Sequence, residues 1–305
     1  MKRREFLVGS TAASFAACAP NITTRPKPRF AVTMDDFNLN FEEVLSPLER
    51  NKRILNALAK HNHKAAGFVT GQFVNNEIGD KVVQTWSEAG HLLGNHTYTH
   101  MNSSEEVVRV IEADILKNDE LMSNYAGYEK IFRFPFLAEG GTPNKVESYR
   151  RFLRENGFRT APVTIDTIDW YTATRLETYL KADPSADLSG FRDYYVDMVI
   201  TLANHFQSLA ERLGYNDLPH TMLMHHTLLN GLFLDDVLSA LKADGWDFVD
   251  AREAFKHPIY ELKPETPTQG RSLLSVLAIE KGLQDTHFPD IYRGFGQKTM
   301  DALGL

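Results

Sequence analysis

Short β-prone runs alternate with longer amphipathic segments along most of this chain, and that alternation limits the folds it can adopt. Strands are expected at about residues 30–34, 65–69, 91–94, 130–133, 158–163, 221–224 and 247–249. Helical patterns fall between most of them, at about 47–60, 80–89 and 105–125. Such alternation predicts a parallel sheet, and closure into a barrel brings functional groups to the carboxyl ends of the strands.

Length and charge narrow the class of protein further. The 305 residues suit one barrel domain with additional segments. The net charge of −7 argues against nucleic acid as a partner, because sequence-independent binding to nucleic acid needs a dense basic surface. No apolar run of membrane-spanning length follows residue 20, so contact with a membrane is expected only through the N-terminus.

The N-terminus has the layout of an export signal. Arg3–Leu7 resembles a twin-arginine signal, and Phe15–Cys18 resembles a bacterial lipobox, although Phe15 stands where Leu is usual. We expect removal of residues 1–17, lipidation of Cys18, and a tether over residues 18–28, which would make the protein a periplasmic or cell-surface lipoprotein. The alternative is an ordinary cleaved signal peptide with an incidental Cys. A lone cysteine excludes an intramolecular disulfide.

Five short segments carry the candidate catalytic and metal-binding residues, and each lies at or just after an expected strand. They are Thr33-Met34-Asp35-Asp36, His96-Thr97-Tyr98-Thr99-His100, Arg133-Phe134-Pro135-Phe136, Asp166-Thr167-Ile168-Asp169-Trp170 and Leu223-Met224-His225. A single pair of histidines at spacing four is weak evidence, but the ordered set is specific. The set resembles the motifs of the polysaccharide deacetylases, the NodB homology domain of carbohydrate esterase family 4, over about residues 30–255.

The resemblance implies an α/β fold, a distorted (β/α) barrel of the NodB type with fewer repeats than the regular eight. We expect the barrel to span residues 29–257, with a helical insertion at about 174–220 and a C-terminal extension at 258–305. The amphipathic segment 192–213 would form the insertion, and its His205 is expected to be structural. The extension holds a helical pattern at 272–282, outside the five segments.

Asp36, His96 and His100 are the candidate metal ligands. A helical turn beginning at His96 would put His96 and His100 on one face, and two imidazoles with one carboxylate leave a coordination position open for water. Zinc is the favoured divalent ion, and cobalt or nickel would also fit the donor set. Taken alone, an Asp pair after a strand is more often a loop or helix cap.

The remaining roles come from the resemblance combined with simple acid–base chemistry. Asp35 is the candidate general base, and Arg133 would keep it ionised and aimed. His225 is the candidate acid that protonates the leaving nitrogen, with Asp169 orienting its ring. His226 competes for this role, but adjacent strand residues face opposite sides and the motif spacing favours His225. Ordinary ion pairs are the alternative for Arg133 and Asp169.

Two further groups complete the predicted site. Pro135 would fix the backbone so that the amide of Phe136 points at the developing oxyanion, and the Phe136 side chain replaces the usual Tyr of the family. Trp170 and Phe134 would line a wall for a sugar ring or acetyl group, with burial in the core as the alternative.

The expected function is a metal-dependent hydrolase that removes acetyl groups from N-acetylated sugars of an envelope or extracellular polysaccharide. Its partner would be an acetylated polysaccharide or oligosaccharide. Two alternatives stay open: an O-acetyl esterase or small-amide hydrolase of the same superfamily, and a carbohydrate-binding envelope lipoprotein without turnover. The presence of both a candidate base and a candidate acid argues against the last.

Overall fold

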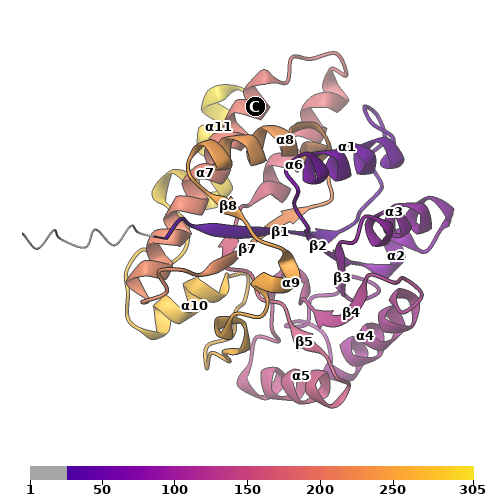
Figure 1. The fold of residues 1–305 in the computed structure, drawn as a ribbon, viewed down its shortest axis with the longest axis vertical. Helices are drawn as coiled ribbons and strands as arrows, with labels where there is room; N and C mark the ends of the chain where they lie inside the picture. Colours follow the sequence, from indigo (N-terminus) through magenta and orange to yellow (C-terminus); the bar gives the residue numbers. More distant parts are fainter. Residues whose placement is uncertain (1–25) are drawn as a thin grey trace, which may run out of the picture.

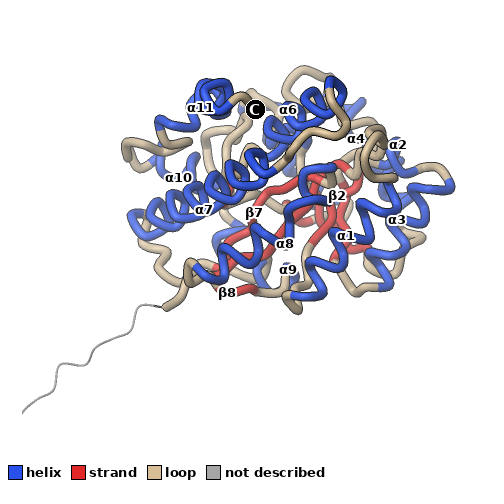
Figure 2. The backbone as a smooth tube through the Cα atoms, turned by 90° about the horizontal axis from the view of Figure 1, so that it is seen from above, coloured by secondary structure: helices blue, strands red, loops and turns tan. Residues whose placement is uncertain are grey.

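The structure is a computed structural model that describes residues 26–305, in which helices surround a curled parallel sheet (Figures 1 and 2). The expected signal, the lipidation site Cys18 and most of the tether lie outside the described residues. The strands are β1 (Arg29–Asp36), β2 (Ala66–Val69), β3 (Leu92–Asn95), β4 (Tyr128–Phe132), β5 (Arg159–Thr160), β6 (Ile165–Asp166), β7 (Pro219–His225) and β8 (Asp247–Phe248).

Helices separate most of the strands along the chain. The α-helices are α1 (Pro47–Lys60), α2 (Gly71–Val74), α3 (Glu77–Glu88), α4 (Val108–Met122), α5 (Pro143–Glu155), α6 (Asp169–Ala182), α7 (Ser189–Arg212), α8 (Leu228–Ala243), α9 (Ala251–Ala254), α10 (Leu273–Glu280) and α11 (Gln297–Leu303). Short 3-10 segments are η1 (Pro135–Leu137), η2 (Pro258–Glu261) and η3 (Asp290–Gly296).

The sheet is an incompletely closed barrel. Its strands run in the order β5-β4-β3-β2-β1-β7-β6, all pairs are parallel, and β8 pairs with the start of β1. The path ends at β5 and at β6, which are consecutive in the chain but are not paired with each other. The predicted α/β fold, a distorted barrel of the NodB type, is confirmed. We call the opening between β5 and β6 the seam.

The central strand β1 delivers the first two candidate residues to the sheet edge. β1 is buried along most of its length, as expected for a parallel strand covered on both faces. β7 pairs with it from Arg29 to Asp35, and β2 pairs with its second half. In this register Asp35 is the direct partner of His225, so the ends of β1 and β7 lie side by side.

Helix boundaries follow their capping residues. α1 begins as predicted, because Ser46 accepts a hydrogen bond from the Glu49 amide and Pro47 occupies the first turn. The helix expected from residue 105 begins three residues later, at Val108. The difference arises because the amides of Glu105 and Glu106 both donate to the Asn102 carbonyl, which makes a separate turn.

The later segments pack against the same core. α7 buries one face on α8, and α1 lies on the other side of α8 (Figure 2). Buried side chains from residues 258–305, among them Tyr260, Leu274 and Met300, belong to the main hydrophobic cluster. Within the described residues, no helix has both the length and the apolar character needed to cross a membrane.

Candidate active site

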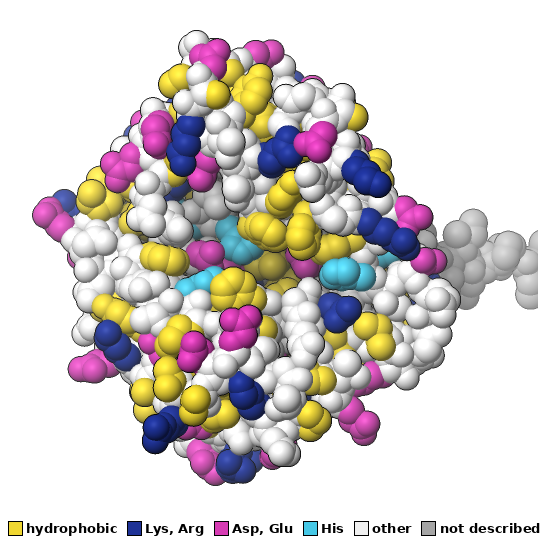
Figure 3. Space-filling view, turned by 180° about the vertical axis from the view of Figure 1, so that it is seen from behind, with side chains coloured by type: hydrophobic (Ala, Val, Ile, Leu, Met, Phe, Trp, Pro, Cys, Tyr) yellow, Lys and Arg dark blue, Asp and Glu magenta, His cyan; other side chains and the backbone are white. Residues whose placement is uncertain are grey.

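Three strand ends bring polar side chains to one cleft. Asp35 and Asp36 end β1, His96 and His100 follow β3, and His225 ends β7. All five line a cleft of about 380 Å³. On the face of the molecule shown in Figure 3, histidine and acidic side chains gather with apolar ones around a central hollow. The structure therefore brings the predicted ligands and the predicted acid and base together.

The three candidate ligands form a compact cluster. Oδ1 of Asp36 lies 3.0 Å from Nε2 of His100 and 3.3 Å from Nε2 of His96. One ligand atom from each residue lies within 4.8 Å of the other two. Burial raises the pKa of the Asp36 carboxyl, but the two imidazoles outweigh this and hold that pKa well below its usual range.

The hydrogen bonding of His96 leaves one of its ring nitrogens free to bind a cation. Nδ1 of His96 lies 2.9 Å from the carbonyl oxygen of Arg133, which can only accept, so Nδ1 carries the proton and Nε2 presents a lone pair. That lone pair faces Oδ1 of Asp36, a buried oxygen that receives no hydrogen bond from the part of the chain that the structure describes. Two imidazole nitrogens and a carboxylate oxygen converging in this way suit a divalent metal ion.

The backbone between the two histidines is not the helical turn that spacing four predicted. His96 to His100 form an irregular loop, with positive φ at Thr97 (64°) and His100 (59°). The Asp114 carboxylate on α4 accepts from the amides of Tyr98 and Thr99, both at 2.9 Å. Asp114 was missed by the sequence analysis, because a helix residue 14 positions beyond His100 carried no signal.

Asp35 is held from behind by Arg133. Nη1 of Arg133 donates to Oδ1 of Asp35 at 2.7 Å and to the Thr33 hydroxyl at 2.8 Å, while Nε donates to the Ala161 carbonyl at 2.9 Å. Asp35 and Arg133 are both 2% exposed. Burial lowers the pKa of Arg133, and the neighbouring Asp35 carboxylate opposes that shift. A charge-assisted bond of this kind fixes the direction of the carboxylate.

His225 is held by Asp169 through two contacts. Its Nδ1 lies 2.7 Å from Oδ1 of Asp169, and its backbone amide donates to Oδ2 at 2.8 Å. Although burial alone would lower the pKa of His225, the Asp169 carboxylate raises it to about 10. The Asn230 amide also donates to Oδ2 of Asp169, and the Tyr195 hydroxyl donates to Asn230. Sequence reasoning missed both of these supporting residues.

His226 faces away from the cluster. Its ring stacks on Phe37 at 4.8 Å between centroids, and its Nε2 lies 3.1 Å from the Asn51 side-chain oxygen. The side chain is fully buried, and that burial holds the pKa of His226 well below its usual range. Of the two adjacent histidines, His225 is therefore the one that shares the cleft with Asp35 and Asp36.

Asp166 is a further buried acid in the cleft wall, to which sequence reasoning gave no role. Burial raises its pKa to about 6. The two-residue strand β6 places Asp166 beside Leu223 of β7. Asp166 is the first residue of the fourth segment, and this position in the sequence could have indicated that it belongs to the site.

Aromatic side chains form the upper wall of the cleft. Phe136 is exposed, has φ of 58°, and its ring lies 4.6 Å from that of His100. Trp170 packs against Phe295 at 4.9 Å between centroids, and Phe288 completes this wall. Phe134 is instead buried against Tyr149, so it belongs to the core. Pro135 begins the 3-10 turn η1 that presents Phe136.

The fold and this cluster define a barrel protein with a candidate metal centre at the carboxyl edge of its sheet. The profile of the polysaccharide deacetylase family matches residues 23–160, which include the first three segments. Over these residues, somewhat less than half of its length, the chain is similar to the polysaccharide deacetylase family.

Relatives with assigned names match part of the chain. A peptidoglycan-N-acetylglucosamine deacetylase of Bacillus cereus is 31% identical over 144 residues, which are 47% of this chain and 47% of that protein. A peptidoglycan-N-acetylglucosamine deacetylase of Listeria monocytogenes is 29% identical over 118 residues, which are 38% of this chain and 23% of that protein. The match therefore spans about half the length of the relative from Bacillus cereus and about a quarter of the relative from Listeria monocytogenes.

Solved structures share the fold. A polysaccharide deacetylase from Bacillus cereus superposes with a TM-score of 0.54 at 22% identity, covering 74% of this chain and 92% of that one. A carbohydrate esterase family 4 pseudoenzyme from Bacillus anthracis superposes with a TM-score of 0.51 at 20% identity, covering 76% and 66%. The fold is thus common to proteins described as deacetylases and as pseudoenzymes.

Proposed function

We propose that the protein is a metal-dependent hydrolase that removes acetyl groups from N-acetylated sugars of a cell-envelope polysaccharide. The match of residues 23–160 to the deacetylase family supports a deacetylase, and the names of the relatives from Bacillus cereus and Listeria monocytogenes support an N-acetylglucosamine polymer as substrate. A substrate of this kind lies outside the cytoplasmic membrane, which supports export directed by residues 1–17 and anchoring through a lipidated Cys18.

One observation carries this proposal: a buried Asp–Arg pair and a His–Asp pair flank the same three-residue cluster. Asp35 and His225 are register partners on β1 and β7, and both line the cleft with Asp36, His96 and His100. A protein that only binds carbohydrate has no need for a held carboxylate and a held imidazole on two sides of one cluster.

In the proposed reaction, Asp35 accepts a proton from the water that attacks the acetyl carbonyl, while Arg133 keeps the carboxylate aimed. The backbone N–H of Phe136 would stabilise the developing oxyanion. His225, with Nδ1 held by Asp169, keeps a proton on Nε2 and donates it to the nitrogen as the carbon–nitrogen bond breaks. The products are acetate and a free amine on the sugar.

Asp36, His96 and His100 would hold the divalent ion, with zinc favoured by the donor set. When bound, such an ion polarises the acyl carbonyl and lowers the pKa of water.

The test is acetate release by the full-length protein from N-acetylglucosamine oligomers and from acetylated xylan, before chelation, after chelation and after zinc or cobalt is added back. Release from the N-acetylated oligomers that chelation abolishes and metal restores is the expected result. Release from xylan alone would replace the proposal with an O-acetyl esterase. Stoichiometric metal uptake without release from either substrate would favour a binding protein similar to the pseudoenzyme neighbour.

A further inference from the structure

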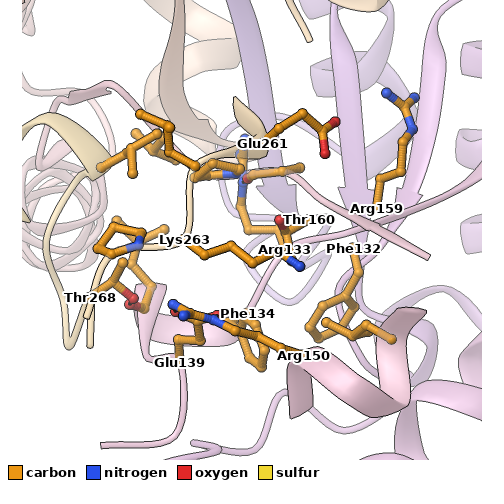
Figure 4. A pocket seen from close by; sticks show the side chains of 18 of the residues that line it. Phe132, Arg133, Phe134, Glu139, Arg150, Arg159, Thr160, Glu261, Lys263 and Thr268 are labelled. Carbon is orange, nitrogen blue, oxygen red and sulfur yellow. Dashed lines mark hydrogen bonds and ion pairs between the residues drawn. The ribbon is translucent and has the colours of Figure 1, made fainter. Parts of the chain in front are cut away.

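A second cavity lies at the seam of the sheet, apart from the candidate active site. It has a volume of about 270 Å³ and opens between the β4–α5 region and the segment 261–273 of the C-terminal part (Figure 4). We call it the seam cavity. Leu137 lines both the seam cavity and the catalytic cleft, and Arg133 also lines the seam cavity. Of the residues that line the seam cavity, the mechanism proposed above uses only Arg133.

Much of the wall is apolar. The rings of Phe132, Phe134 and Phe158 and the side chains of Leu153 and Leu273 line the cavity, and all five residues are buried. An inorganic anion or a free sugar would leave this wall unused. A ligand with a hydrocarbon part would remove additional apolar surface from water on entering.

The wall of the seam cavity carries a net positive charge, whereas the chain as a whole is negatively charged. Six cationic side chains and two anionic ones line the cavity, a surplus of four positive charges in a chain whose net charge is −7. Glu139 is already paired in a bidentate manner with Arg150, at 2.7 Å for each contact. Among the described residues, Arg154, Lys263 and Arg271 have no ion-pair partner. Arg133, Arg150 and Arg159 have ion-pair partners, so the unpaired positive charge of the wall rests on the other three cations.

The buried guanidinium of Arg133 supplies an independent observation. Its Nη2 has no hydrogen-bond partner among residues 26–305, although the residue is only 2% exposed. Nη2 shares one edge of the guanidinium with Nε, and Nε donates to the carbonyl of Ala161, another residue of the cavity wall. The free donor thus lies on the same edge of the guanidinium as the bond to the wall residue Ala161, whereas the bond to Asp35 uses Nη1. An unpaired buried donor favours an acceptor at this point.

We propose that the seam cavity binds a small amphipathic carboxylate, with its hydrocarbon chain on the apolar wall and its carboxylate at Arg133 Nη2. Lys263 and Arg271 add attraction at the rim. A carboxylate suits the guanidinium because it accepts charge-assisted hydrogen bonds, and a single negative charge is enough for one free donor. The C-terminal segment 261–273 thereby forms one side of a binding site.

Calorimetric titration of the full-length protein with octanoate, below its micelle concentration, tests this proposal. We expect one octanoate per chain, and binding at least tenfold tighter than that of octanol, which has the same chain without the charge. Affinity should rise about fourfold per methylene from hexanoate to octanoate, as burial of one methylene predicts. Equal affinity for octanol, or no binding of octanoate at millimolar concentration, would overturn the proposal.

A matched pair of variants locates the site. Lys263→Gln with Arg271→Gln should weaken octanoate binding about fivefold to tenfold, because two rim cations are removed. Lys52→Gln with Lys242→Gln removes the same charge from exposed lysines outside the cavity and should leave the affinity unchanged. Equal loss in both variants would mean that octanoate responds only to the net charge. Inorganic phosphate that competes as strongly as octanoate would reduce the site to one for simple anions.

Discussion

Asp35 and His225 are each held by one buried partner, Arg133 for the carboxylate and Asp169 for the imidazole. We predict that Asp35→Asn or His225→Ala lowers kcat for deacetylation by about 10²- to 10⁴-fold, because each change removes one proton-transfer group. Circular dichroism and metal content should remain those of the parent protein. Parent-like rates in either variant would rule out the proposed roles.

The Asp169 carboxylate is the group that raises the pKa of His225. Asp169→Asn removes this charge from a buried site, so the imidazolium loses its counter-ion and the pKa of His225 should fall well below 10. Titration of the His225 ring followed by NMR in metal-free protein measures the change. A pKa that stays near 10 in the variant would mean that another group stabilises the imidazolium.

At the level of elements, the strand β3 depends on a glycine. A Cβ at Gly94 would lie 2.6 Å from Cε1 of Phe68 and 2.9 Å from Cγ2 of Ile131, and both of those side chains are buried. We predict that Gly94→Ala costs about 1–3 kcal/mol of unfolding free energy through overpacking. Urea unfolding measures this cost. An unchanged midpoint would mean that the two side chains can move aside.

Predictability from sequence differed among elements for physical reasons. The bounds of α1 were predicted because Ser46, Pro47 and an amphipathic stripe act locally. The strand β6 was missed, since two residues show no periodicity. Within the site, ordered motifs indicated the candidate ligands and the candidate acid and base, which the structure brings to one cleft. Phe288 and Phe295 could not be found in this way, because their place at the cleft depends on how the C-terminal segment packs.

For the whole molecule, buried neutral histidines predict sensitivity to acid. His63 and His91 accept backbone hydrogen bonds from Val32 and Ala65, and His220 is fully buried. Burial lowers the pKa of His91 to about 4 and those of His63 and His220 to about 3. Between the ordinary pKa of about 6.5 and these values, the unfolded chain binds protons that the folded chain does not.

Unfolding free energy should therefore fall as the pH drops from about 6.5 toward 4, by up to about 1.4 kcal/mol per pH unit for each of these histidines. Chemical unfolding at pH 7, 5.5 and 4.5 measures the slope. His63→Gln keeps an acceptor for the Val32 amide and should reduce the slope by one histidine's share. An identical slope in that variant would show that His63 does not contribute.

The pairing of β1 with β7 has a consequence for how this site can vary. Asp35 and His225 are direct neighbours across a parallel ladder, so the separation of their Cα atoms is set by the spacing of strands, about 4.8 Å in any sheet. Loops above the sheet can change in length and sequence without altering that separation. A shift of one residue in the register of the two strands, however, would turn one of the side chains to the opposite face of the sheet. Such a shift would therefore remove either Asp35 or His225 from the cleft.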